Sequence, residues 1–331
     1  LVPSAFFVTD LGTEKFAFGL GTTSSWGLGT EWHADSFARY AATKSTIEMK
    51  DYLITGAYQM TEKFSLGLGL DIDDAMVDKH KKLYQAGMGD GDFRLKATDT
   101  SVGFRVAGMY KVNERHQFGA MYRSAIDHKY RGTVMTSNLG NDGVNNYQAV
   151  FGGTSYQTDV EAKATLPQGI LLGYSYRPNE KWTMNLDLEW TDWSSTKDEV
   201  LTYPTETNAV RLAYLQNGVA TPRDWDSVLS VGAGAEYALS ETWRVRGGGF
   251  YRQGPVPGDT WEPNLPDADN FGIALGTGMN LTKSLVLDLA WSMIQYKDRV
   301  VDNTVNDTYG GIDGTYKNSA NLLYATLTWE F

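Results

Sequence analysis

Long stretches in which apolar and polar residues alternate constrain this chain more than any other feature. Between Phe64 and Ile72 every second residue is large and apolar, and the residues between them are small or polar. The same alternation recurs at 182–190, 271–279, 285–293 and 323–331. A period of two predicts β-strands with one apolar face. Runs of this length exceed the ~5–6 residues of an ordinary strand and match the ~9–11 residues of a membrane-crossing strand.

Short polar turns precede most of these strands. They begin at Gly12, Met60, Val112, Pro178, Leu239 and Leu281. The connections at the other strand ends are long and polar, near 24–42, 76–98, 133–158, 195–225, 253–269 and 297–317. Short turns on one side and long loops on the other are typical of outer-membrane barrels. We expect little helix, a turn or two within Lys79–Ala86.

These strands should close into a single barrel domain spanning residues 1–331, because an open sheet edge in lipid leaves backbone groups unpaired. The alternation predicts about thirteen strands, whereas single-chain bacterial barrels have an even number. We therefore expect either that the first strand is absent from this chain or that the count is off by one. A soluble sandwich or propeller would show the same alternation, and partitioning into detergent would distinguish the two.

Composition excludes several other functions. The chain carries 29 Lys and Arg against 40 Asp and Glu, and this acidity argues against a nucleic-acid partner. It has no cysteine, and its four histidines lack the spacing of a metal site, so we expect no metal and no cofactor. The acidic stretches Gly89–Asp92 and Asp302–Asp313 lack the ordered spacing of a calcium loop and are read as polar turns. We expect no catalytic site, since His128 near Ser124 is the only local pair that suggests a hydrolase.

Several short motifs occur in a fixed order along nearly the whole chain. They are Phe16–Trp32, Leu166-Pro167, Leu188–Ser194, Arg223–Trp225, Ser230–Gly232, Trp243–Arg246, Pro255–Pro257, Pro266–Asp269 and Trp329–Phe331. In this order they resemble the FadL/TodX family, outer-membrane transporters of long-chain fatty acids and hydrophobic aromatic compounds. The family's N-terminal hatch segment and first strand find no match here. Asn270 stands where the family commonly has Arg.

The resemblance implies an all-β fold, a 14-stranded antiparallel transmembrane β-barrel in the Gram-negative outer membrane. It also implies a kinked third strand that opens sideways into the bilayer, which maps to Ser24, Ser25, Trp26 and Gly27. The residues agree with a break in strand order there, since Ser-Ser interrupts the alternation and glycine permits a bulge. A simple loop start is the alternative.

Passive uptake of a hydrophobic small molecule follows as the expected function. Outer-loop residues that match the family's ligand-capturing segments are Leu83, Tyr84, Met88, Phe93, Tyr147 and Phe151. Side chains at alternate positions of a strand point to opposite faces of the sheet. By this alternation we expect a second set of ligand-binding residues to face the lumen: Arg105, Met109, Met121, Arg123, Arg244, Arg246 and Phe250. Arginine beside apolar side chains suits a carboxylate on an apolar tail. An ion-pair network with lumen acids such as Asp288 would equally account for these arginines.

The expected partners are the hydrophobic ligand, outer-membrane lipid and the barrel-assembly machinery, the last through the C-terminal Phe331. We expect a monomer. A general diffusion porin for small polar solutes is the alternative function, and it would need a constriction loop and measurable conductance. The sequence does not distinguish a fatty acid from an aromatic hydrocarbon as the substrate.

Overall fold

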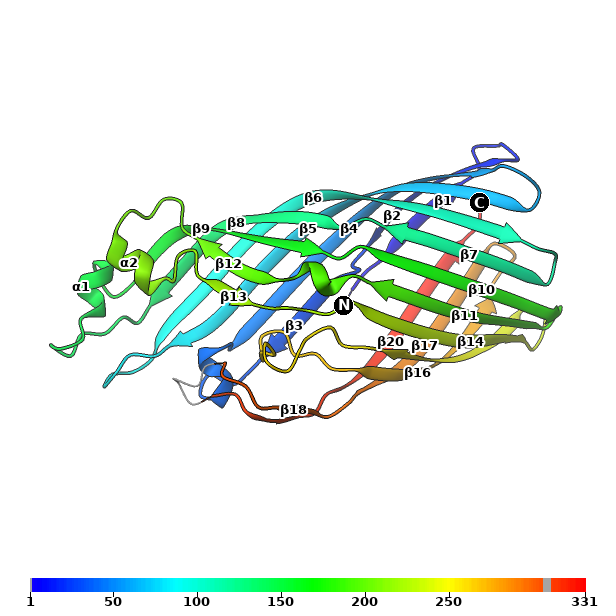
Figure 1. The fold of residues 1–331 in the computed structure, drawn as a ribbon. Helices are drawn as coiled ribbons and strands as arrows, with labels where there is room; N and C mark the ends of the chain where they lie inside the picture. Colours follow the sequence, from blue (N-terminus) through cyan, green and yellow to red (C-terminus); the bar gives the residue numbers. More distant parts are fainter. Residues whose placement is uncertain (1, 306–310) are drawn as a thin grey trace.

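The computed structural model describes residues 2–305 and 311–331, and within them eighteen strands form one sheet that curls on itself (Figure 1). Neighbouring strands pair antiparallel, which confirms the predicted fold class. The strands are β1 (Ala5–Thr9), β2 (Phe16–Thr23), β3 (Gly27–Glu31), β4 (Lys44–Gln59), β5 (Phe64–Leu83), β6 (Gly91–Lys111), β7 (His116–Arg123), β8 (Ile126–Ser137), β9 (Tyr156–Leu166), β10 (Gly169–Asn179), β11 (Trp182–Thr191), β12 (Asp198–Thr202), β13 (Ala220–Pro222), β14 (Val228–Ala238), β15 (Trp243–Arg252), β16 (Asn270–Asn280), β17 (Leu285–Tyr296) and β20 (Ser319–Trp329).

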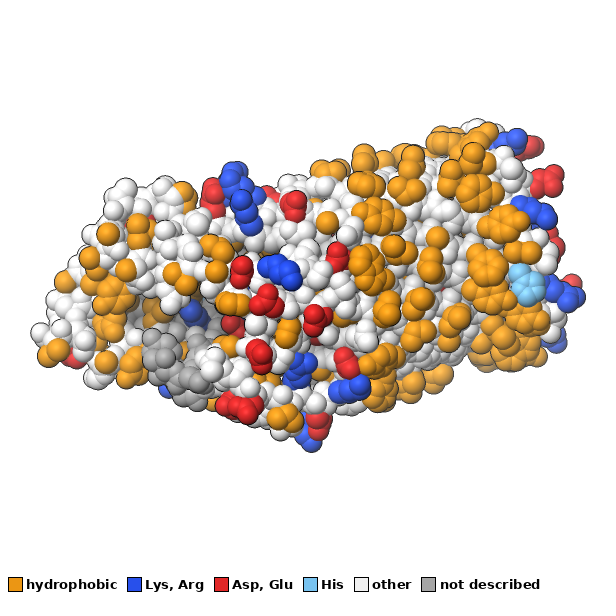
Figure 2. All heavy atoms as spheres, in the orientation of Figure 1, with side chains coloured by type: hydrophobic (Ala, Val, Ile, Leu, Met, Phe, Trp, Pro, Cys, Tyr) orange, Lys and Arg blue, Asp and Glu red, His pale blue; other side chains and the backbone are white. Residues whose placement is uncertain are grey.

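The two faces of β5 show which side of the sheet is the outside of the barrel. Leu66, Leu68 and Leu70 are 39 to 65% exposed, whereas Asp71 and Asp73 on the opposite face are each 2% exposed. A soluble sandwich would bury the leucines and expose the acids. Figure 2 shows exposed apolar side chains gathered over one half of the visible face, with charged side chains mainly on either side of them. Within the described residues, no helix is both long and apolar enough to cross a membrane.

The short turns at one end of the wall share one local structure. In each turn a Ser, Thr or Asn side chain accepts a hydrogen bond from a backbone N–H two or three residues later. Thr61 Oγ1, for example, accepts from the N–H of Phe64 at 3.0 Å. The acceptors are Thr13, Thr61, Asn113, Asn179, Ser240 and Thr282. These residue types close turns through their own side chains, and this explains the repeat seen in the sequence.

Strands β5 and β6 extend far beyond the apolar band. The sequence led us to expect a long loop at 76–98 and helix within Lys79–Ala86, and both expectations are wrong, because β5 runs to Leu83 and β6 begins at Gly91. Cross-strand ion pairs hold this polar part of the ladder. Lys82 Nζ lies 2.7 Å from Asp92 Oδ1, and Arg94 Nη2 lies 2.8 Å from Asp78 Oδ2. Opposite charges facing across a strand pair stabilise it where no apolar face is needed.

The end with the long connections carries the remaining elements, at the left of Figure 1. They are helices α1 (Tyr147–Phe151) and α2 (Ala209–Tyr214), the 3₁₀ helices η1 (Phe37–Tyr40) and η2 (Trp193–Ser195), and a small sheet of β18 (Arg299–Val301) and β19 (Gly314–Tyr316). In the acidic stretch Gly89–Asp92, Asp90 accepts hydrogen bonds from Arg39 and Tyr40. The second acidic stretch, Asp302–Asp313, includes residues 306–310, which lie outside the described part of the chain.

Strands β1 and β20 stand at the two ends of the pairing order. Among the described residues, β1 forms backbone pairs only with β2, and β20 only with β17. Across this seam Phe7 stacks on Phe331 with ring centroids 6.0 Å apart. The fourteen strands that the resemblance implies therefore stay a prediction.

Candidate ligand chamber

A cavity of about 840 Å³ lies inside the wall, in the half toward the long connections. Its size falls within the ~300–1,000 Å³ of pockets that hold small organic molecules. The apolar side chains that line it include Leu28, Ile47, Met49, Val77, Leu95, Val160, Leu166, Leu201 and Val228. We call this cavity the chamber.

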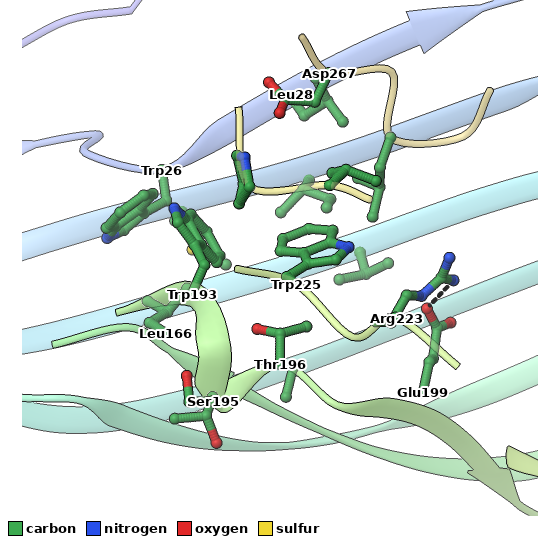
Figure 3. A pocket seen from close by; sticks show the side chains of 18 of the residues that line it. Trp26, Leu28, Leu166, Trp193, Ser195, Thr196, Glu199, Arg223, Trp225 and Asp267 are labelled. Carbon is green, nitrogen blue, oxygen red and sulfur yellow. Dashed lines mark hydrogen bonds and ion pairs between the residues drawn. The ribbon is translucent and has the colours of Figure 1, made fainter. Parts of the chain in front are cut away.

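Three tryptophans, Trp26, Trp193 and Trp225, lie along one side of the chamber (Figure 3). The rings of Trp26 and Trp193 meet edge to face with centroids 5.1 Å apart, and Trp193 meets Trp225 in the same way at 5.1 Å. The guanidinium of Arg123 lies 4.6 Å from the centre of the Trp26 ring. Two donors here are buried without a hydrogen-bond partner, Arg123 Nε and Trp225 Nε1. This side therefore offers a ligand both aromatic surface and unused N–H groups.

A bulge in the wall opens beside these aromatic rings, at the predicted kink. Thr23 at the end of β2 pairs with Asp51 of β4, and Gly27 at the start of β3 pairs with Glu48. Thr23 and Gly27 are four steps apart, but their partners are only three steps apart. One extra residue is therefore inserted opposite β4, which bends the strand and interrupts its ladder. Ser25, Trp26 and Gly27 line the chamber, so the interruption borders the cavity.

Buried ion pairs form the far side of the chamber. Glu199 of β12 lies 2.8 Å from Lys79 Nζ and 2.6 Å from Arg223 Nη2, and Arg223 Nη1 lies 3.1 Å from Glu262. Burial by itself raises the pKa of the Glu199 carboxyl, but the charges of Lys79 and Arg223 outweigh it and hold that pKa well below its usual range. Burial raises the pKa of the Asp267 carboxyl to about 6, so this acid loses its charge in mildly acidic solution.

A smaller recess of about 150 Å³ adjoins the chamber and shares Lys79, Glu199 and Arg223 with it. Lys81 lines this recess, with its Nζ 5.4 Å from the centre of the Phe93 ring. Unlike Lys79, it forms no ion pair with any described residue. Burial lowers the pKa of the Lys81 ammonium, against the attraction of Glu262 and Glu199. The recess thus offers a cation whose charge is not neutralised by direct contact.

The arginines predicted to face the lumen have different partners. Arg105 pairs with Asp71 at 2.6 Å, and Arg246 pairs with Glu236 at 2.6 Å and with Asp288. Arg244 donates a hydrogen bond to Asn280 at 3.1 Å. Arg123 alone of the predicted lumen set is among the described residues that line the chamber, so Met109, Met121 and Phe250 lie elsewhere on β6, β7 and β15.

The predicted outer-loop residues pack against different neighbours and do not meet at one site. Phe151 is buried in an apolar cluster that Phe93 and Tyr147 join from its edge. Tyr84 meets Tyr40 edge to face at 5.9 Å, and Leu83 ends β5. Met88 packs so closely on Gly140 that a Cβ there would come within 2.5 Å of its sulfur. Phe93 is the one member of this set among the described residues that line the recess.

Sequence reasoning missed several chamber residues. Trp193 and Trp225 were noted only as parts of recognisable motifs, and Glu199 and Lys81 were not singled out. The sequence does contain a signal for Lys81. This residue lies two positions from Lys79, so the two share a face of β5, but the sequence pattern predicts a loop for this segment. Nothing in the sequence indicated that Lys79 and Glu199 would meet.

An antiparallel wall with an outward apolar band, short turns at one end and an apolar chamber within defines a transport barrel of an outer membrane. The chain belongs to the family of outer membrane transport proteins described as OMPP1/FadL/TodX, whose profile matches residues 1–331.

Among its relatives, a putative outer membrane protein of Neisseria meningitidis is 24% identical over 250 residues, which cover 73% of this chain and 53% of that protein. A long-chain fatty acid transport protein of Escherichia coli O6:H1 is 22% identical, covering 88% of this chain and 68% of that protein. This chain thus spans about half to two thirds of the length of these relatives.

Solved structures show the same fold. A FadL homologue of Pseudomonas aeruginosa superposes with a TM-score of 0.84 at 21% identity, covering 99% of this chain and 78% of that one. The toluene transporter TbuX of Ralstonia pickettii superposes with a TM-score of 0.73 at 19% identity, covering 99% of this chain and 80% of that one. At these identities the likeness establishes the barrel fold.

Proposed function

We propose that this protein is a channel for passive uptake of hydrophobic small molecules across the outer membrane. The observation that carries the proposal is the apolar chamber, whose lining includes Ser25, Trp26 and Gly27 at the bulge between β2 and β3. A molecule in the chamber lies beside the one place where the β2–β3 strand leaves its ladder. Lateral exit there would deliver it into the bilayer and avoid the polar periplasm.

A long-chain carboxylate is the substrate class that the charges favour. Arg123 lies in the apolar chamber and Lys81 in the adjoining recess, and neither forms an ion pair with a described residue. A carboxylate would supply the missing charge, and charge-assisted hydrogen bonds are the stronger kind. The names of the relatives support both substrate types, since one transports long-chain fatty acids and another toluene.

The proposal contains no catalytic step. In the structure, Ser124 Oγ accepts a hydrogen bond from the Phe104 N–H, and His128 contacts Asp73 and Asp99. The proposal also includes a monomer surrounded by lipid, with the exposed Phe331 available to the assembly machinery.

Tryptophan fluorescence tests the proposal, because Trp26, Trp193 and Trp225 line the chamber. Oleate titrated into the full chain in lipid nanodiscs should change the emission saturably. Trp225→Phe should remove a large part of this change, whereas Trp182→Phe, on the exposed outer face, should leave it intact. Absence of an oleate response, together with stable ionic conductance in planar bilayers, would instead identify a diffusion porin.

Lys81→Met should weaken oleate binding about tenfold, the effect of losing one charge-assisted contact worth ~1.5 kcal/mol. Affinity for toluene, which has no charge, should not change. Lys82→Met is the matched control, because Lys82 is already paired with Asp92 at 2.7 Å. Equal oleate affinities for the Lys81 and Lys82 variants would show that the recess does not bind the headgroup.

A further inference from the structure

Two buried carboxylates face each other on the lumen side of the wall. Asp51 of β4 and Asp73 of β5 are directly opposite in the β4–β5 ladder, and they are only 3% and 2% exposed. Each keeps one oxygen, Oδ1, without a hydrogen-bond partner. Two carboxyl groups directly opposite each other give the ladder no stabilising contact of their own.

Asp51 is also bonded to the bulge. Its Oδ2 accepts a hydrogen bond from the backbone N–H of Ser25 at 2.9 Å, and the neighbouring Ser24 hydroxyl donates to the Met49 carbonyl at 2.6 Å. Ser25 lies in the segment that has left the β2–β4 ladder, so its N–H has no strand partner there. The Asp51 carboxylate takes the place of that partner.

Asp73 connects the pair to the neighbouring strands β6 and β8 of the same wall. Its Oδ2 lies 3.8 Å from Nε2 of His128 on β8, and Nδ1 of His128 lies 3.0 Å from Asp99 Oδ2 on β6. The His128 side chain is fully buried. Charged and titratable groups that face this cluster from the packed strands are Asp71 on β5, Asp99 and Arg105 on β6, Arg123 on β7, and His128 and Tyr130 on β8.

We propose that Asp51 is a positioning residue for the lateral exit, because its carboxylate fixes the backbone of the bulge at Ser25. A carboxylate is a stronger acceptor than a neutral group, so removing it should loosen the bulge. This inference rests on the proposed function only in calling the bulge an exit.

The test uses a thiol placed at the bulge, which the absence of cysteine in the chain permits. Ser25→Cys keeps the backbone N–H that Asp51 binds, and the side chain at this position is exposed. Alkylation by a charged maleimide is followed in the full chain in nanodiscs at neutral pH. With Asp51 intact, labelling should be slow.

Asp51→Leu should accelerate labelling about tenfold, because the acceptor is lost. Asp51→Asn keeps an acceptor and should restore slow labelling. Asp74→Leu is the matched control, since Asp74 lies on the opposite, exposed face of β5. If Asp51→Leu labels at the unmodified rate, the inference is wrong.

A variant that does not fold is recognised by its mobility on unheated gels. In that case Asp51→Ser decides, since the hydroxyl of this shorter side chain should not reach the Ser25 N–H: labelling should again be fast, and labelling at the unmodified rate overturns the inference. Oleate transfer to acceptor vesicles is measured on the same samples. Labelling that depends on Asp51 without any oleate binding would refute the uptake function while the positioning role stands.

Discussion

An Arg123→Met variant is expected to bind oleate about ten- to a hundredfold more weakly than the unmodified protein, with unchanged affinity for toluene. The guanidinium lies over the Trp26 ring in an apolar chamber, and its Nε is buried without a partner. A charge-assisted hydrogen bond to a carboxylate in such surroundings contributes ~1.5–3 kcal/mol, which corresponds to this range of affinity. Fluorescence titration of both ligands in nanodiscs measures the effect.

Two further variants separate charge from packing. Arg123→Lys keeps the positive charge and should recover part of the oleate affinity. Arg246→Met removes an arginine that already pairs with Glu236 and Asp288, so it should leave oleate binding unchanged. Tight oleate binding by Arg123→Met would show that this arginine stabilises the barrel wall and does not bind the ligand.

Glu199→Gln should lower the free energy of unfolding by about 2 kcal/mol. The substitution leaves Lys79 without a charge partner and Arg223 with only Glu262. Glu199 faces the chamber, so the loss should fall between the ~0–1 kcal/mol of an exposed ion pair and the ~3–5 kcal/mol of breaking a buried one. Guanidinium unfolding in micelles, followed by tryptophan fluorescence, measures the change.

The pH dependence of this difference has a defined sign. The pKa of Glu199 is lowered in the folded protein, so its stabilisation is complete at neutral pH. It is lost as the pH falls through the lowered pKa, below the ordinary ~4.3 of glutamate. The difference between the two proteins should therefore shrink in strong acid. Glu161→Gln, which breaks exposed pairs with Lys129 and Arg131, should have little effect at any pH; an equal loss in both variants would contradict the role assigned to Glu199.

The parts of the fold that depend on local pattern were predictable. Alternation between Phe64 and Ile72 indicated a wall strand, and turn residues such as Thr61 indicated where hairpins reverse. The outer half of β5 was not predictable, because its stability comes from cross-strand pairs such as Arg94 with Asp78 and not from an apolar face.

The site was predictable only in part for a similar reason. The alternation of the strands predicts that Arg123 and Arg246 both face the lumen. It does not show that Arg246 is paired with an acid whereas Arg123 is not, because that depends on which acids lie near each arginine in the closed wall. Lys79 and Glu199 are 120 positions apart in sequence, and only the closed wall brings them together. The break at Ser24–Gly27 was visible in the residues themselves, whereas its contact with Asp51 required the register of β2 and β3 on β4.

The side-chain bonds that close the short turns bear on how the protein assembles. Each one joins residues two or three positions apart, so a turn can form before its strands have found their neighbours. Contacts this local cost little chain entropy to form, and proteins rich in them fold faster. The hairpins along the wall can therefore form one by one, each independently of the others. The slow step in assembly is then left to the pairing of one hairpin with the next, which joins residues farther apart in the chain.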